Sequence, residues 1–222
     1  MKVIVNREAP PKILERLACF AEIVPFWAPL LEEKALRGHA DLFLTQVDDT
    51  CIMAPDAPQN VQMVPHLAGT IAVDDGKAAW GAYNVAAGRR IAIGNEKYVD
   101  ATVLEALKGH HLLSVRQSMA RCNALILEDD AVITSDGGIA KAIAKKGWTC
   151  LLVSPKEIIL PGYRNGCFGG CCGIREGTVF LTGSLKYHPD GAEIARYIHL
   201  HNMKLKELSD APLFDVGSLF FL

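Results

Sequence analysis

Apolar and polar residues follow one local pattern that occurs four times along the chain. Each copy has an apolar strand, a short polar turn, a second apolar strand and small or polar residues that open a helix. The four copies span residues 42–56, 83–96, 123–137 and 171–184. Their second strands align at four β-branched residues, Ile52, Ile91, Val132 and Val179. The spacings of 39, 41 and 47 residues predict a repeated unit of about 40 residues.

The residue types between and after the strands predict hairpins that are followed by helices. The turns are the polar or glycine pairs that hairpins favour: Asp48-Asp49, Gly88-Arg89, Asp129-Asp130 and Glu176-Gly177. Helices are expected after Asp100, after Ser135 or Asp136, and from Pro189. A further strand follows each helix, at 112–115, 149–153 and 204–208. In the first copy Pro55, Pro58 and Pro65 interrupt the helix.

The two chain ends supply the parts of a fifth copy. The N-terminal MKVIVN, a helix over 11–20 and a strand over 22–26 lack only the first strand of a hairpin, and the C-terminal FDVGSLFFL is a lone strand. If the two ends join, the chain closes into a ring without a long exposed sheet edge. No linker-like segment divides the sequence, so we expect one α/β domain over residues 1–222.

Composition and charge exclude some partner classes. Half of the 222 residues are hydrophobic. The net charge of −2 gives no excess of positive charge that would bind nucleic acid or an acidic membrane. The start, MKVIV, is typical of a strand and not of a secretory leader, and no apolar run is long enough to span a bilayer. We therefore expect a cytoplasmic protein. Its seven cysteines, an odd number, indicate reduced thiols and no disulfide framework.

The stretch from Pro161 to Ile174, PGYRNGCFGGCCGI, is the most unusual part of the chain. It holds five glycines and three cysteines. Glycine lets a ligand or another backbone come close to the main chain, so this stretch predicts such an approach.

Five units of strand, strand, helix and strand resemble the pentein fold, the α/β propeller of the guanidino-group-modifying enzymes. The runs GHADLFL, ITSDGGIAKAI, GYRNGCFGGCCG, LKYHPDG and DVGS resemble, over nearly the whole chain, a bacterial family of uncharacterised proteins assigned to that fold. The enzymes of this fold include arginine and agmatine deiminases, dimethylarginine dimethylaminohydrolases and amidinotransferases. The resemblance to them implies a site at the ring centre. There a cysteine attacks the guanidinium carbon, a histidine transfers protons and carboxylates bind the nitrogens. Their cysteine usually lies in the final strand, which here reads DVGSLFFL and has none.

Cys167, Cys171 and Cys172 are the candidate substitutes for the missing thiol. If the segment is a strand, Cys167, Gly169 and Cys171 lie on one face and Cys172 on the other. This favours Cys171 as the nucleophile, while Cys172, Gly169 and Gly170 would line the pocket. The alternative is that these cysteines are small buried hydrophobic residues. Their spacing is not one of the usual zinc patterns, so we expect no metal and no cofactor.

His39 and Asp41 lie two residues apart and would project from the same side of a strand. His39 would then transfer protons and Asp41 would bind the substrate. The alternative is a turn histidine followed by an aspartate that binds its own backbone. Asp215 is expected at the mouth of the site. We expect Gln117 and Arg121 at the start of the first strand of the third unit, where both side chains would face the same opening.

Two functions remain open on the sequence alone. One is a cysteine-dependent hydrolase or amidinotransferase that acts on the C–N bonds of a guanidino compound. The other is a non-catalytic module that binds a small cationic ligand in the same pocket; a homodimer is compatible with either. A ribosome-binding role of the same architecture ranks last, because the chain has no basic face.

Overall fold

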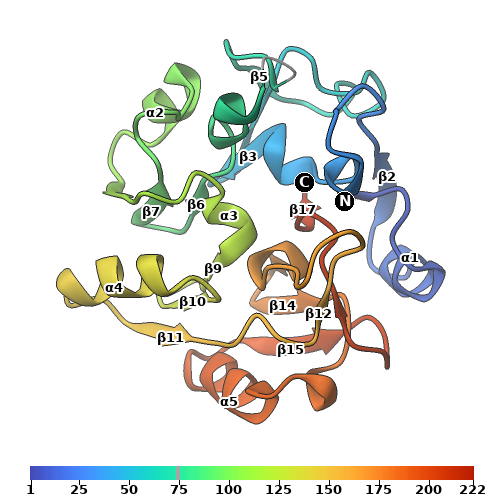
Figure 1. Cartoon of the computed structure of the whole chain (residues 1–222), viewed down its shortest axis with the longest axis vertical. Coiled ribbons are helices and arrows are strands. Elements are labelled where there is room, and N and C mark those ends of the chain that lie inside the picture. Colours follow the sequence, from blue (N-terminus) through green and yellow to red (C-terminus); the bar gives the residue numbers. More distant parts are fainter. Residues whose placement is uncertain (74–75) are drawn as a thin grey trace.

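The computed structural model describes residues 1–73 and 76–222, and these contain five three-stranded sheets arranged as a ring (Figure 1). In each sheet the first and second strands form an antiparallel pair, and the third strand is parallel to the second. Four sheets are continuous in sequence. The first contains β3(Leu44–Val47), β4(Thr50–Met53) and β5(Leu67–Ala68), and the second contains β6(Ala86–Ala87), β7(Ile91–Gly94) and β8(His111–Ser114). The third contains β9(Ala124–Ile126), β10(Val132–Thr134) and β11(Cys150–Leu152), and the fourth contains β13(Cys172–Arg175), β14(Thr178–Leu181) and β15(Lys204–Glu207). The predicted α/β propeller of repeated units is confirmed.

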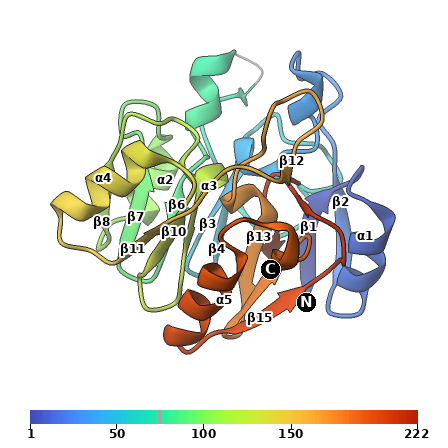
Figure 2. The same ribbon diagram turned by 60° about the horizontal axis from the view of Figure 1, so that its bottom comes forward.

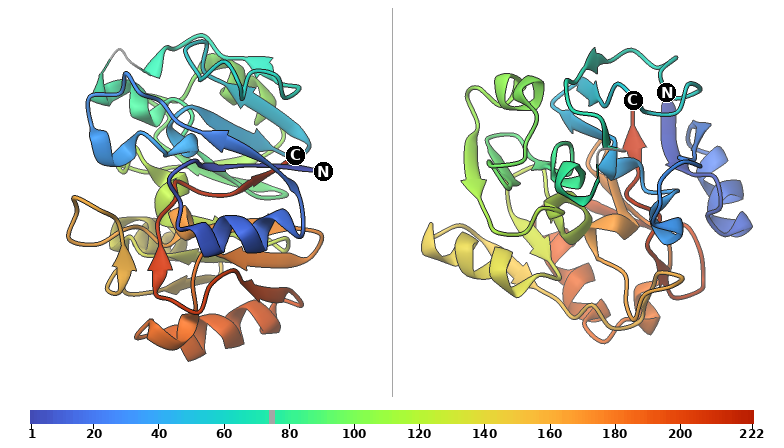
Figure 3. Two further views of the ribbon diagram at one scale, coloured as in Figure 1. Left: turned by 90° about the vertical axis from the view of Figure 1, so that its right-hand side faces the viewer. Right: turned by 45° about the horizontal axis from the view of Figure 1, so that its top comes forward.

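The fifth sheet is assembled from both ends of the chain. Its strands are β17(Phe220–Phe221), β1(Lys2–Asn6) and β2(Glu22–Phe26), in that order. The backbones of Lys2 and Leu222 exchange two hydrogen bonds of 2.8 Å, and Figures 1 and 3 show the two termini side by side. The predicted closure of the last unit by the two termini is therefore confirmed.

Helices lie outside the sheets, as the amphipathic patterns predict (Figure 1). They are α1(Pro11–Ala18), α2(Ala101–Ala106), α4(Gly137–Lys145) and α5(Gly191–Leu200). In α4, Asp136 caps the helix by accepting a hydrogen bond from the backbone N–H of Ile139 at 2.7 Å. Apolar side chains of α4, such as Ile139 and Ile143, are buried with residues of the neighbouring strands. Helix α5 lies against β15 (Figure 2).

The start of α5 differs from the prediction. Helix α5 begins at Gly191, two residues after the expected Pro189. The carboxylate of Asp190 accepts a hydrogen bond from the N–H of Ser154 at 2.6 Å, and its own N–H donates to the His188 ring at 3.1 Å. These contacts hold residues 188–190 outside the helix.

The first strands of the five sheets, which we call the inner strands, surround the ring axis. They are β3, β6, β9, β13 and β17. Neighbouring inner strands contact each other, β3 with β6, β6 with β9 and β13 with β17. A separate parallel pair, β12(Ile158–Ile159) and β16(Leu213–Phe214), brings the segment before β17 to the same region. In the part of the chain that the structure describes, no helix has the length and apolar character that crossing a bilayer requires.

Candidate functional site

The residues that precede the inner strands converge at one end of the ring axis. In four sheets the same position, two residues before the inner strand, is occupied by a buried residue: Asn84, Cys122, Gly170 and Ser218. In the remaining sheet Asp41 lies three residues before β3. Hydrogen bonds join Asp41 to Asn84, to Cys122 and to Ser218. The repeat therefore assembles one cluster from five segments that are far apart in sequence.

Single helical turns precede three of the inner strands and direct the site residues to the axis. These turns are η2(Ala40–Leu42), α3(Ala120–Asn123) and η5(Gly169–Cys171). The strand geometry considered for His39–Asp41 and for residues 167–171 does not occur, whereas the end of the glycine- and cysteine-rich stretch does enter a strand, β13, at Cys172. Phe168 has helical dihedrals, φ −62° and ψ −45°, and the N–H of Cys171 donates to the Phe168 carbonyl at 3.0 Å. The strand alternation proposed for Cys167, Gly169 and Cys171 therefore does not occur.

Two aspartates flank the imidazole of His39. Its Nδ1 lies 3.7 Å from Asp41 Oδ1, and its Nε2 lies 3.8 Å from Asp215 Oδ1. All three side chains are at most 1% exposed. Among the described residues, neither ring nitrogen of His39 nor Oδ1 of Asp41 has a hydrogen-bond partner. The centre therefore holds buried polar atoms with unused bonding capacity, which is uncommon in a folded protein.

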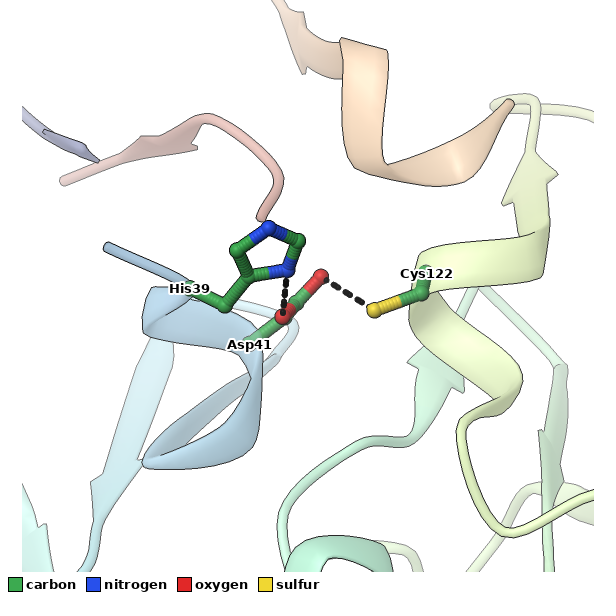
Figure 4. A group of neighbouring side chains, drawn as sticks. All are labelled: His39, Asp41 and Cys122. Atoms are coloured by element: carbon green, nitrogen blue, oxygen red, sulfur yellow. Dashed lines mark hydrogen bonds and ion pairs between the residues drawn. The ribbon is translucent and has the colours of Figure 1, made fainter. Parts of the chain in front are cut away.

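A thiol and a hydroxyl contact the other oxygen of Asp41. The Cys122 thiol donates to Asp41 Oδ2 at 2.9 Å (Figure 4), and the Ser218 hydroxyl donates to the same oxygen at 2.8 Å. The Asn84 side-chain amide donates to the Asp41 carbonyl at 2.9 Å and to Cys122 Sγ at 3.3 Å. These contacts fix the orientations of Asp41 and Cys122 relative to each other.

Backbone groups and two glycines hold Asp215, which directly follows β16. Its Oδ2 accepts from the N–H of Cys167 at 2.8 Å, and its Oδ1 accepts from the N–H of Gly217 at 3.1 Å. A Cβ atom at Gly170 would lie 2.0 Å from Asp215 Oδ1. Gly217 has a positive φ of 69°, and a Cβ there would lie 2.3 Å from His39 Cα. Both positions therefore require glycine if the two aspartates are to flank His39.

Burial and the neighbouring charges raise the pKa values of two groups in the centre, Asp215 and Cys122. Burial raises the pKa of Asp215; the charge of His39 opposes this shift and that of Asp41 adds to it. Burial, followed by the charges of Asp41 and Asp215, raises the pKa of the Cys122 thiol well above its usual value. Cys122 is therefore protonated, in keeping with its hydrogen bond to Asp41, and a cation in the centre would favour its ionised form.

Of the residues selected from the sequence, the structure brings together His39, Asp41, Asp215 and Gly170, whereas the side chains of Cys171 and Cys172 pack beside this cluster. Both cysteines lie in an apolar cluster with residues of β14. Cys171 Sγ is 3.4 Å from the Cys167 carbonyl, and Cys172 Sγ donates to the Phe168 carbonyl at 2.9 Å. Within residues 1–73 and 76–222, no hydrogen bond or ion pair joins Cys171 to His39 or Asp41. The role of Cys171 as nucleophile stays a prediction.

The other selected residues contact the backbone of the site or lie at its border. Arg121, in α3, donates to the carbonyls of Gly169 at 2.9 Å and Cys172 at 3.0 Å, so it supports the glycine- and cysteine-rich segment. Gln117 lies in the loop before α3 and donates to Asp136 at 3.4 Å. Neither residue begins a strand, contrary to the sequence prediction, because α3 and its preceding loop occupy this stretch. Their part in binding a substrate stays a prediction.

A cavity of about 500 Å³ lies at the opposite end of the inner strands. The hairpin turns that contain Asp48, Gly88 and Glu176 border it, and Phe220 and Arg121 contribute to its lining. The inner strands run from the buried cluster to these turns, so the cavity and the cluster are separate places along one axis.

Comparisons with solved structures identify proteins of the same fold. Agmatine deiminase of C. jejuni gives a TM-score of 0.58 at 9% identity over 98% of this chain and 93% of that chain. A cysteine-to-serine mutant of DDAH from Pseudomonas aeruginosa, complexed with citrulline, gives 0.53 at 7% identity over 94% and 91%. A cysteine-to-serine mutant of the C. jejuni enzyme with substrate bound gives 0.57 at 8% identity over 94% and 87%. At such identities the likeness shows the fold alone.

Sequence comparison supplies the family. No curated protein matches the chain. The model of a family of unknown function, DUF6873, matches residues 4–220, which is nearly the whole sequence. The chain therefore belongs to the DUF6873 family and has the fold of the guanidino-group-modifying enzymes.

Proposed function

We propose that the protein binds a small guanidino or amidino compound at the ring centre and acts on it through a thiol, as a hydrolase or amidinotransferase. The observation that carries this proposal is the pair of buried carboxylates, Asp41 and Asp215, on either side of His39 and beside a thiol. A planar cation with several N–H donors suits such a pair of acceptors, and a thiolate suits attack on its carbon. The solved structures of the same fold include an agmatine deiminase with substrate bound.

Each group would have a defined task in the reaction. Asp41 and Asp215 would accept the N–H groups of the cation, whose charge would offset theirs and favour a thiolate. The thiol would give its proton to His39 and its sulfur would form a bond to the guanidinium carbon. The C–N bond to the leaving amine would then break as His39 transfers that proton to the amine. Water, or an acceptor amine, would then release the carbon from sulfur.

A ligand reaches these buried groups only if a covering segment moves. The N–H of Cys167 binds Asp215, and residues 161–164, immediately before this segment, are exposed. Cys167 itself is half-buried, and Asp215 and Asp41 contribute to raising its pKa, so its thiol lies at the edge of the same centre. We propose that the stretch 161–167 moves to admit a ligand, because it is exposed at its start and its last residue contacts Asp215.

Substitution of Asp41 by Asn is expected to weaken binding of a guanidino compound at least 10-fold, because a charged acceptor is lost. Calorimetric titration with agmatine, arginine and methylguanidine measures this effect. The matched control is D210N, since Asp210 is an exposed aspartate outside the ring centre whose carboxylate lies 3.4 Å from the ammonium group of Lys12. Equal affinities of the wild-type protein, D41N and D210N would contradict the proposed site.

The reacting thiol is identified by labelling. The guanidino compound is expected to change the rate at which iodoacetamide modifies one thiol of the centre and to leave the rate of the exposed Cys19 unchanged. Peptide mass spectrometry locates the affected thiol. The position of Cys122 favours Cys122 as the reacting thiol, whereas the sequence favours Cys171. The variants C122S and C171S distinguish the two, because the effect of the guanidino compound on labelling is lost in the variant that lacks the reacting thiol. Uniform modification of all seven cysteines, or modification only after unfolding, would rule out a thiol-dependent reaction.

A second candidate function is binding of the cationic compound without turnover. Two observations favour it: the pKa of Cys122 is raised by burial, and the final segment holds Ser218, not a cysteine, beside Asp41. Under this alternative a guanidino compound raises the melting temperature while no ammonia, urea or transferred amidino group is formed. Detection of any of these products excludes it.

A further inference from the structure

Contrary to the expectation of no metal from the cysteine spacing, we propose that His39, Asp41 and Cys122 form a binding site for a divalent transition-metal ion of the zinc type. One ligand atom from each residue lies within 4.8 Å of the other two, and all three side chains are buried. Figure 4 shows the imidazole of His39 and the sulfur of Cys122 on either side of the Asp41 carboxylate. His39 precedes η2, Asp41 lies in η2 and Cys122 lies in α3, so the ion would join parts of the chain that are about 80 residues apart.

The unpartnered atoms of the cluster are the evidence that something belongs there. Nδ1 of His39 and Oδ1 of Asp41 have no hydrogen-bond partner among the described residues, although both are fully enclosed. They lie 3.7 Å apart, which is longer than a hydrogen bond. Two ligands of one zinc ion, each bound at about 2.0–2.2 Å, lie roughly 3.3–3.5 Å apart in a tetrahedron. A small displacement of either side chain would therefore place Nδ1 of His39 and Oδ1 of Asp41 within bonding distance of one ion.

The three donor types select the class of metal. Imidazole nitrogen, carboxylate oxygen and thiolate sulfur together suit zinc, cobalt or ferrous iron, whereas magnesium and calcium prefer sites made of oxygen alone. Three protein ligands leave one tetrahedral position for water or for the hydroxyl of Ser218, which already contacts Asp41 at 2.8 Å. A fourth position that no protein side chain occupies is typical of catalytic zinc sites.

Neighbouring groups would hold the ligands as they do in known metal centres. Asp215 Oδ1 lies 3.8 Å from Nε2 of His39, the nitrogen that does not face Asp41, so the carboxylate can orient the ring. The amide of Asn84 donates to Cys122 Sγ at 3.3 Å, which suits a sulfur that carries negative charge. Asp215 and Asn84 are thus positioning residues for the metal ligands.

This inference goes beyond the proposed function and does not depend on it. A metal ion and a guanidinium group would both use Asp41, so each would exclude the other from the centre. The test uses the metal alone. A failure to bind metal leaves guanidino binding untouched, and a failure to bind guanidino compounds leaves the metal site untouched.

The experiment is a titration of the chelator-treated full-length protein with Co²⁺, followed by absorption spectroscopy. We expect one equivalent of cobalt to bind, with an intense sulfur-to-cobalt charge-transfer band and the visible bands of tetrahedral cobalt; zinc displaces it. C122A is expected to lose the charge-transfer band and to weaken binding about 100-fold or more. The matched control is C51A, because Cys51 is a buried cysteine of β4 outside the cluster, and it is expected to bind as the wild-type protein does.

A second variant keeps the test independent of the folding of C122A. H39Q is expected to keep the charge-transfer band while the visible bands shift and the affinity falls, because sulfur still binds the ion. Circular dichroism establishes that each variant is folded. A wild-type protein that gives no charge-transfer band with cobalt, or a band that survives in folded C122A, overturns the proposal.

Discussion

Alanine in place of Gly170 is expected to destabilise the protein by about 3 kcal/mol and to abolish ligand binding at the ring centre. The added Cβ would lie 2.0 Å from Asp215 Oδ1 and 2.5 Å from Asp215 Cγ. The carboxylate cannot simply move away, because the N–H groups of Cys167 and Gly217 hold it. The backbone at Gly170 is also fixed, since its carbonyl accepts from Val216 at 3.1 Å and from Ser218 at 2.9 Å.

Urea unfolding followed by tryptophan fluorescence measures the loss of stability in G170A. The control is G137A, because Gly137 begins α4 and a Cβ there meets nothing within 4 Å. Alanine favours the helix, so G137A is expected to be as stable as the wild-type protein or slightly more stable. Equal unfolding midpoints for G170A and G137A would show that Asp215 does not lie against Gly170.

Removal of residues 218–222 is expected to prevent folding. The side chains of Leu219, Phe220 and Phe221 are buried, and each contributes about 1.5–3 kcal/mol through its removal from water. The sum of these three contributions approaches the free energy of unfolding of an ordinary domain, which is about 5–15 kcal/mol. The truncation also removes β17, the strand that pairs with β1, and the Ser218 hydroxyl that binds Asp41. Circular dichroism and hydrogen exchange measure the outcome.

A circular permutant provides the control for this truncation. The backbones of Lys2 and Leu222 are hydrogen-bonded, so a short glycine-serine linker can join the two ends. New ends between Lys108 and Gly109 lie in an exposed turn after α2. This permutant keeps every strand of the ring and is expected to fold cooperatively. A truncated chain that unfolds at the same midpoint as the permutant would contradict closure of the ring by the last strand.

The fold could be predicted because its signals are local and repeated. A pair such as Glu176-Gly177 takes the left-handed conformation at both residues, with φ values of 48° and 68°, and this turn fixes the hairpin around it. The same combination of strands and turn, found four times at a regular period, implied a ring, and the incomplete units at the two ends implied its closure. None of these inferences required knowledge of side-chain contacts.

The site was only partly predictable because it depends on backbone geometry between the repeats. His39 and Asp41 were selected by strand alternation, yet they meet because a helical turn at η2 and the backbone of Gly217 place them there. Cys122 does not stand out in the sequence because it lies just before the apolar pattern of the third copy, which begins at Asn123. An alignment of the residues two positions before each inner strand would have found it, together with Ser218. The burial of Cys171 among apolar side chains depends on tertiary packing that no spacing reveals.

A crystal structure of the protein grown with agmatine tests the central proposal most directly. We expect the guanidinium group to bind the carboxylates of Asp41 and Asp215 beside His39, with the sulfur of Cys122 near the guanidinium carbon. Agmatine bound only in the cavity beside the hairpin turns, or a ring centre unchanged at saturating agmatine, would contradict it.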